Sequence, residues 1–287
     1  MKKFLTLVVT AILAISCLFG LTACQPKKDV LKVIDIALNQ EEYAFAVTKD
    51  NADLLNSLNN YMTKIKGNGV FDNIVSKYQN DESGKVGIAL GVGTPSANDL
   101  VVLTNTPFEP FEYVGTDGLY YGIDMEIMKG FAEDIDKNLF LVEHLDFDTI
   151  CNQANQYPNA IVAAGLTYEA SRALIVDFSQ TYYEANQVVI ARADDTTFDN
   201  CTTAEEVIDI LMGLTAETKI GYQNGTTGQL FVDGDEDWGF TKLPVTGQGY
   251  KTAALASQDV INKNIDYVIV DASPAKAIVK ALNKLNK

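Results

Sequence analysis

Two segments rich in glycine and threonine, together with one arginine, have the composition of an anion site. Gly165-Leu166-Thr167 leads into a short predicted helix that carries Arg172, and Gly225-Thr226-Thr227-Gly228 begins a second helix. Free backbone N–H groups at a helix N-terminus attract anions, and a guanidinium binds a carboxylate through two parallel hydrogen bonds. These residues predict a carboxylate site, although an isolated arginine is more often a surface charge.

One acidic residue, Asp271, could bind the opposite charge. It comes directly after the apolar segment 265–270, and a third polar segment, 105–113, follows the apolar run 100–103. Ligands of open α/β sheets lie beyond the carboxyl ends of the strands, which places Asp271 where it can receive an ammonium group. The alternative is that its side chain caps the following helix. A carboxylate and an ammonium group together make an α-amino acid the predicted ligand.

Strands and helices alternate along most of the chain. We expect strands at 33–38, 43–47, 100–103, 140–142, 160–164, 188–191, 219–222 and 265–270. We expect helices at 53–66, 71–78, 122–136, 149–156, 169–175, 204–212, 228–232, 250–263 and 274–285. This alternation predicts an α/β fold with parallel sheets.

The composition limits the possible functions. The chain has 287 residues, is 47% apolar, and carries a net charge of −16 from 22 basic and 38 acidic residues. Such a chain can form one large domain or two modest ones and is not a disordered protein. Nucleic acids are excluded as partners because their binding requires a basic surface, whereas no Lys/Arg run here exceeds two residues.

The N-terminus has the pattern of an export signal. Lys2 and Lys3 precede an almost entirely apolar stretch over 4–21, which is typical of a signal peptide, although eighteen such residues are also close to the length of a membrane span. The ending Leu21-Thr22-Ala23-Cys24 resembles the lipobox of bacterial lipoproteins. We expect a signal peptide at 1–23 and a tether at 24–30. The mature protein would be extracytoplasmic and anchored to the outer face of the cell membrane by lipid on Cys24.

The remaining cysteines and acidic residues show no metal-binding pattern. Cys17 belongs to the signal, and the spacing of Cys151 and Cys201 fits no metal or redox motif. The acidic loop 233–237 lacks the register of an EF-hand and its downstream glutamate. A disulfide between Cys151 and Cys201 is open to an exported protein, and we expect no metal and no cofactor.

Seven motifs in one order resemble the amino-acid-binding solute-binding proteins of ABC transporters, which have the type 2 periplasmic-binding-protein fold. They are T-N-T-P-F-E-P-F-E-Y (104–113), G-I-D-M-E-I (122–127), F-D-T-I (147–150), A-G-L-T-Y-E-A-S-R (164–172), V-D-F-S-Q-T-Y-Y (176–183), G-T-T-G (225–228) and I-V-D-A-S-P-A (269–275). The resemblance implies two α/β lobes that close on the ligand as a clamp. Each lobe would contain a mainly parallel sheet flanked by helices, and two crossover strands would form the hinge.

The same resemblance implies roles for the charged and hydroxyl residues of the site. Arg172 would bind the ligand carboxylate, helped by Gly165, Thr167 and Thr227. Asp271 would bind the ammonium group together with oxygens of Gly165 or Thr167. The site would capture its ligand without any chemical reaction.

Four further residues would contact the ligand side chain. Phe108 and Phe147 match aromatic positions that enclose it, although lone aromatic residues usually belong to the core. Asn105 and Gln223 match positions that tune specificity. Members that take cationic ligands commonly have Asp where this chain has Asn105, so the resemblance favours a neutral polar amino acid such as glutamine.

The order of segments differs from that of the family. The final segment of the family stands at the front of this chain, at 33–47 and 69–78, so the sequence resembles a circular permutant. The expected large lobe is 44–79 plus 100–181, and the expected small lobe is 31–40 plus 187–287. Residues 80–99 would link the usual ends, with crossovers near 40–43 and 181–186. Cys151 and Cys201 would then lie in different lobes, and because a disulfide between them would block the opening of the hinge, we expect both to be free thiols.

The resemblance implies a monomeric receptor that delivers an amino acid to the permease subunits of an ABC importer, which read its closed form. A sensor or scavenger of the same fold is an alternative. A dehydratase-type enzyme on this scaffold is another alternative, but it needs a general acid or base in the cleft. The only carboxylate that the sequence places there is Asp271, so we expect no enzymatic activity.

Overall fold

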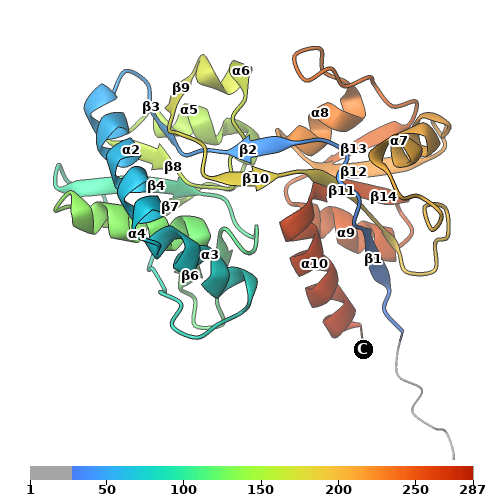
Figure 1. Ribbon diagram of the computed structural model, residues 1–287, viewed down its shortest axis with the longest axis horizontal. Coiled ribbons are helices and arrows are strands. Elements are labelled where there is room, and N and C mark those ends of the chain that lie inside the picture. Colours follow the sequence, from blue (N-terminus) through green and yellow to red (C-terminus); the bar gives the residue numbers. More distant parts are fainter. Residues whose placement is uncertain (1–27, 287) are drawn as a thin grey trace, which may run out of the picture.

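Two five-stranded sheets form the centres of two lobes in the computed structural model, which describes residues 28–286 (Figure 1). The predicted signal peptide, Cys17 and Cys24 lie outside these residues. The first sheet has the order β7 (Asn138–Glu143), β4 (Asp99–Thr104), β8 (Ala160–Val162), β3 (Ala46–Thr48) and β9 (Val176–Phe178). The second has the order β1 (Leu31–Ile34), β11 (Gln187–Arg192), β14 (Tyr267–Asp271), β12 (Lys219–Gln223) and β13 (Thr246–Tyr250).

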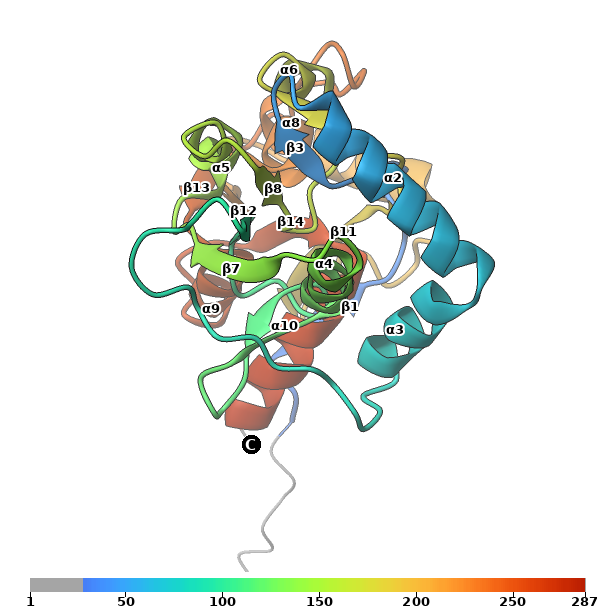
Figure 2. The ribbon, with the colours of Figure 1, turned by 90° about the vertical axis from the view of Figure 1, so that its left-hand side faces the viewer.

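Helices α2 (Ala52–Gly67), α3 (Val70–Gln79) and α4 (Ile123–Asp134) cover the first sheet. Figure 2 looks onto this lobe and shows α2 and α3 beside α4. Helix α2 begins where the Asn51 side chain accepts a hydrogen bond from the Leu54 N–H, a common N-cap. Its buried residues recur at helical spacing and form one apolar face, namely Leu54, Leu58, Tyr61, Met62 and Ile65. Burial of this face holds the helix on the lobe.

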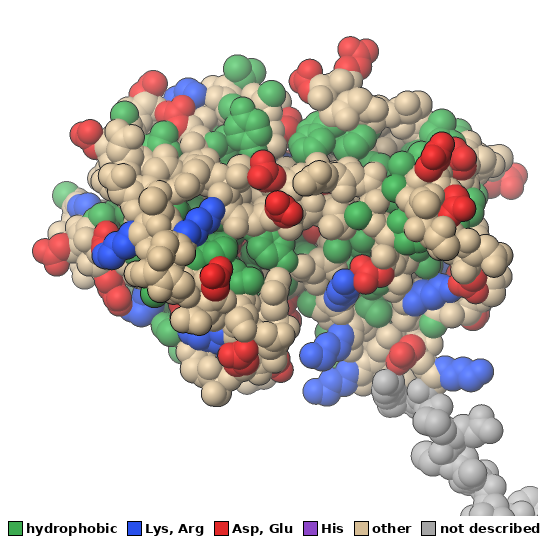
Figure 3. Space-filling model, viewed as in Figure 1, with side chains coloured by type: hydrophobic (Ala, Val, Ile, Leu, Met, Phe, Trp, Pro, Cys, Tyr) green, Lys and Arg blue, Asp and Glu red, His purple; other side chains and the backbone are tan. Residues whose placement is uncertain are grey.

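The second sheet is covered on both faces. Along β11, Val188 and Ile190 pack with α9 (Ala253–Ile261) and α10 (Ala272–Leu285), whereas Val189 and Ala191 pack with α7 (Ala204–Met212) and α8 (Thr227–Asp233). Successive strand residues point to opposite faces of a sheet, so an apolar run such as 188–191 requires this two-sided cover. Acidic side chains are scattered over the face of the molecule that Figure 3 shows.

Two short strands connect the lobes, which confirms the predicted two-lobed α/β clamp with crossover strands. Strand β2 (Glu41–Tyr43) pairs antiparallel with β10 (Tyr183–Ala185), and Figure 1 shows both running between the lobes. Within residues 28–286 no helix is long and apolar enough to cross a bilayer. Cys151 is buried in the first lobe, Cys201 lies in the second, and both are free thiols.

Residues near the N-terminus belong to both sheets. Strand β1 pairs with β11 in the second sheet, whereas β3 lies between β8 and β9 in the first. Residues 80–98 run along the first lobe, where Ile88 pairs with Tyr120 and Leu90 pairs with Leu141. A circular permutant requires such an arrangement, and the permutation itself stays a prediction.

Each sheet is mainly parallel, as predicted, because four of its five strands run in the same direction. Only β3 and β11, which follow the crossovers, run antiparallel to their neighbours. Two of the predicted strands have wrong bounds. The strand predicted at 43–47 is two strands, β2 and β3, since the chain enters the lobe between them. The strand predicted at 33–38 is β1 and ends at Ile34.

Strand β9, strand β13 and one short hairpin have no counterpart among the predicted elements. Strand β13 gives no strand signal because its sequence, T-G-Q-G-Y, carries two glycines. It pairs in parallel with β12. The hairpin of β5 (Tyr113–Val114) and β6 (Tyr120–Tyr121) gives no strand signal in the sequence, because each of its strands is only two residues long.

Candidate functional site

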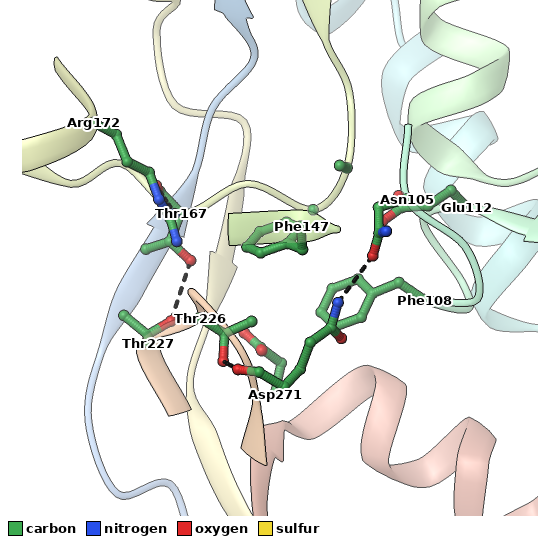
Figure 4. A pocket seen from close by; sticks show the side chains of 12 residues that line it. Asn105, Phe108, Glu112, Phe147, Thr167, Arg172, Thr226, Thr227 and Asp271 are labelled. Carbon is green, nitrogen blue, oxygen red and sulfur yellow. Dashed lines mark hydrogen bonds between the residues drawn. The ribbon is translucent and has the colours of Figure 1, made fainter. Parts of the chain in front are cut away.

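A closed cavity lies where the two lobes meet, and all nine residues predicted to bind the ligand line it (Figure 4). The cavity volume is only about 10 Å³, and most of the side chains that line it are buried. The lobes are therefore closed tightly on one another. The predicted lining residues are Asn105, Phe108, Phe147, Gly165, Thr167, Arg172, Gln223, Thr227 and Asp271, and Glu112, Ala164 and Thr226 complete the wall.

Arg172 is held in place by atoms of both lobes. It lies on the short helix α6 (Ala170–Ala173), is 9% exposed, and donates from Nη1 to the Thr167 carbonyl oxygen at 2.8 Å. Its Nη2 donates to the Gly225 carbonyl oxygen of the opposite lobe at 2.6 Å. Its Nε lies 3.2 Å from a Glu169 carboxylate oxygen, and its guanidinium carbon lies 5.4 Å from the Phe147 ring centre. The ion pair and the cation–π contact fix the plane of the guanidinium at the cavity wall.

Two glycines of the predicted anion segments are required by close packing. Gly165 has φ +51°, and a Cβ there would lie 2.5 Å from the Phe108 ring. Gly225 has φ +75°, and a Cβ there would lie 2.6 Å from Cα of Asp148 in the opposite lobe. An L side chain is disfavoured at such φ angles, so glycine permits both the turn and the contact between lobes.

Asp271 provides a buried carboxyl group at the end of β14. It is 5% exposed, and its Oδ1 accepts a hydrogen bond of 2.6 Å from the Tyr43 hydroxyl. Burial and the nearby Glu41 raise the pKa of Asp271 well above its usual value. Although Asp271 occupies the N-cap position of α10, its side chain makes no capping hydrogen bond. The side chain is thus directed to the cavity wall, and the helix-cap alternative is not supported.

Glu112 is a second carboxyl group in the cleft, one that the sequence does not single out, so the expectation of a single carboxylate is corrected. It is fully buried, and neither carboxyl oxygen has a hydrogen-bond partner among the described residues. Burial raises the pKa of Glu112 well above its usual value, and Asp124 and Asp271 add to the effect. Its place after Phe111 in an irregular loop gives no periodic signal of burial, so only the fold reveals it.

Two amide side chains meet across the cleft beside the aromatic residues. Gln223 Nε2 donates to Asn105 Oδ1 at 2.9 Å, and Asn105 Nδ2 donates to the His144 carbonyl oxygen at 2.6 Å. The Thr167 and Thr227 hydroxyls also face each other across the cleft at 3.5 Å (Figure 4). The cavity thus has an arginine and hydroxyl groups at one end and amide groups at the other. Within residues 28–286 no cluster of His, Cys, Asp and Glu is arranged to hold a metal ion.

Comparison of the sequence with known proteins finds one matching family and several related proteins. Residues 100–286 match the model of the bacterial extracellular solute-binding proteins, family 3. The arginine-binding extracellular protein ArtP of Bacillus subtilis (strain 168) is 30% identical over 95 residues, which cover 33% of this chain and 36% of that protein. The ABC transporter arginine-binding protein 1 of Escherichia coli (strain K12) is 24% identical over 181 residues, 63% of this chain and 66% of that protein. The match thus spans about a third of the first relative's length and just under two thirds of the second's.

Solved structures share the fold. An ancestral arginine-binding protein bound to arginine has a TM-score of 0.54 and 26% identity over 64% of this chain and 74% of that chain. The arginine-bound form of truncated ArgBP from T. maritima has the same TM-score with 24% identity over 64% of this chain and 78% of that chain. The ancestral amino-acid-binding protein AncCDT-1, a precursor of cyclohexadienyl dehydratase, is similar to the same extent, with a TM-score of 0.54 and 24% identity over 64% of this chain and 74% of that chain.

Proposed function

Because this chain belongs to the bacterial extracellular solute-binding proteins, family 3, we propose that it captures a polar L-amino acid between its lobes and delivers it to an ABC importer. One observation carries the proposal. Arg172 and Asp271 come from different lobes, yet both line one closed cavity together with the other predicted residues. Such a site can bind a carboxylate at one point and an ammonium group at another without chemistry.

The backbone of the amino acid would be held by charge-assisted hydrogen bonds. Arg172 would bind the carboxylate by exchanging its bonds to the Thr167 and Gly225 carbonyl oxygens for bonds to the ligand. Thr227 and the Gly165 segment would share the carboxylate. Asp271 would accept hydrogen bonds from the ammonium group, with oxygens of Gly165 or Thr167 completing its coordination.

For the side chain of the ligand we propose a neutral polar group of the glutamine type. The Asn105 and Gln223 amides already bond to each other across the cleft and can each bond a ligand amide instead. A cationic ligand is the second candidate, and the buried, unpartnered Glu112 carboxyl favours it. The rings of Phe108 and Phe147 would enclose the aliphatic part of either ligand.

We also infer that the chain is a circular permutant with a large lobe of 44–79 plus 100–181, a small lobe of 31–40 plus 187–287, and a linker at 80–99. The family match that begins at residue 100 supports this inference, as does the presence of β1 and β3 in different sheets. Lipid on Cys24 would then tether the small lobe, beside α10, where the Asn283 side chain accepts hydrogen bonds from the Val30 and Leu31 N–H groups.

A thermal-shift panel of the twenty amino acids tests the proposal. A ligand present at about 100 times its Kd should stabilise the folded protein by about 2.7 kcal/mol. Arg172→Ala should abolish the shift in melting temperature. The chain has one other arginine, Arg192, which does not line the cavity, and Arg192→Ala should preserve the shift. The proposal is wrong if no amino acid raises the melting temperature, or if Arg172→Ala responds as the unmodified protein does.

A further inference from the structure

Two acidic side chains lie next to each other beneath the cavity. Glu41 lies on the crossover strand β2 and Asp271 at the end of β14, and the two residues are 3% and 5% exposed. Gln187 donates from Nε2 to Glu41 Oε1 at 2.7 Å and stands opposite Asp271 in the register of β11 and β14. Tyr43, two residues after Glu41 on the same face of β2, donates to Asp271. The two carboxyl groups therefore lie next to each other, and because adjacent buried carboxylates repel strongly, such a pair favours keeping one proton.

The hydrogen bonds around the pair place that proton on Asp271. Glu41 Oε1 accepts from Gln187 Nε2 at 2.7 Å, and its Oε2 accepts from Thr227 Oγ1 at 2.6 Å and from Thr167 Oγ1 at 3.0 Å. Three donors stabilise a carboxylate on Glu41. Asp271 accepts from the Tyr43 hydroxyl and is left as the acid that donates to Glu41.

The pair has no cation of its own among the described residues. The arginine that lines the cavity, Arg172, is already in an ion pair with Glu169 and bonded to two carbonyl oxygens. Burial raises the pKa of Tyr43, so its hydroxyl stays neutral. The titratable groups that act on the pair are Tyr43 on β2 and Glu112 in the loop after β4. Arg172 lines the same cavity as Asp271. Lys276 on α10 lines the groove on the other side of Asp271 but forms an ion pair with Asp35.

We propose that Glu41 and Asp271 act as one acid pair that holds a single proton, and that the ammonium group of an amino-acid ligand replaces this proton. The proposal rests on the proposed function. The O–H bond of Asp271 breaks, the proton passes to a base in the solvent, and ligand N–H groups donate to the two carboxylates. The local charge stays at −1, because the singly protonated pair becomes two carboxylates and one ammonium group. Glu41 is thus a positioning and charge-balancing residue of the ammonium site, contributed by the hinge.

Isothermal titration calorimetry in two buffers measures the proton. L-Glutamine, or L-arginine if glutamine does not bind, is titrated at pH 7 in phosphate and in Tris, whose ionisation enthalpies differ. We expect release of about one proton per ligand and a Kd that falls about tenfold when the pH is raised from 6 to 7. Glu41→Gln should still bind ligand but release almost no proton. Glu42→Gln, the exposed neighbour on the same strand, should release as much as the unmodified protein.

The outcomes separate this inference from the proposed function. An amino acid that binds the unmodified protein without proton release overturns the acid pair and leaves the binding function intact. Full release by Glu41→Gln also overturns it. If no amino acid binds, the binding function fails and ligand-driven release fails with it. The unliganded protein then tests the pair by infrared difference spectroscopy between the unmodified protein and Glu41→Gln. The buried acids Glu112 and Asp124 contribute bands of protonated carboxyl groups to both proteins and cancel in the difference. The unmodified protein should show one further carbonyl band, and its absence from the difference spectrum refutes the shared proton.

Discussion

Gly225 packs directly against Asp148 of the opposite lobe, so Gly225→Ala tests whether ligand binding needs the closed form. A Cβ at this position would lie 2.6 Å from both Cα and Cβ of Asp148 and 3.1 Å from its backbone N. Carbon atoms in contact are normally about 3.5–4.0 Å apart. The lobes of the variant must therefore separate locally by about 1 Å before the methyl group fits.

The size of the effect follows from the cost of overpacking, which is about 1–3 kcal/mol. This cost falls on the closed form and not on the open form, so Kd should rise about 5- to 150-fold. The left-handed backbone adds a separate cost of about 1–2 kcal/mol, because Gly225 has φ +75°. That second cost acts on folding in both open and closed forms and should lower the free energy of unfolding without affecting closure.

Gly239→Ala is the matched control for this variant. Gly239 also has a left-handed backbone, with φ +69°, but nothing lies within 4 Å of the position that an added methyl group would occupy. Both variants should lose similar free energy of unfolding in urea titrations, and only Gly225→Ala should lose ligand affinity in calorimetry. Small-angle X-ray scattering should show a larger radius of gyration for ligand-saturated Gly225→Ala. If the two variants bind ligand equally tightly, the lobes do not close at Gly225 and the reasoning is refuted.

Two further predictions concern a buried acid and the choice of ligand. Burial raises the pKa of Asp124 to about 7, so its folded form binds a proton more tightly than the unfolded form. This stabilisation is complete below about pH 4 and is lost as the pH rises to about 7. Asp124→Asn should therefore show a decline in unfolding free energy between about pH 4 and pH 7 that is smaller by on the order of a few kcal/mol. Equal declines of the two proteins in urea titrations would contradict this. Asn105→Asp places a charge at the amide end of the cavity and should strengthen arginine binding about tenfold relative to glutamine; unchanged relative affinities would count against a role for Asn105 in specificity.

Those features of the fold that depend on a local sequence pattern could be predicted. The apolar residues of α2 recur at helical spacing, and Gly165 and Gly225 follow strands, so the helix and the position of both segments could be predicted. What could not be predicted depends on partners distant in the chain. Strand β13 exists because β12 supplies its hydrogen bonds, not because T-G-Q-G-Y favours a strand. Glu112 is buried because residues far along the chain close over it, and no spacing in residues 105–113 marks it.

The site also shows why motifs reveal the residues that line the cavity more readily than the buried groups behind them. All nine predicted residues lie within 100–286, the part of the chain that matches the family. Glu41 and Tyr43 lie outside that part, on a three-residue strand whose alternation buries positions 41 and 43 and exposes 42. Alternation predicts that Glu41 and Glu42 face opposite sides, but it does not say which side meets Asp271. That strand is also a crossover between the lobes, so the groups beside Asp271 come from the hinge. A change in the angle between the lobes therefore acts directly on the proposed ammonium site.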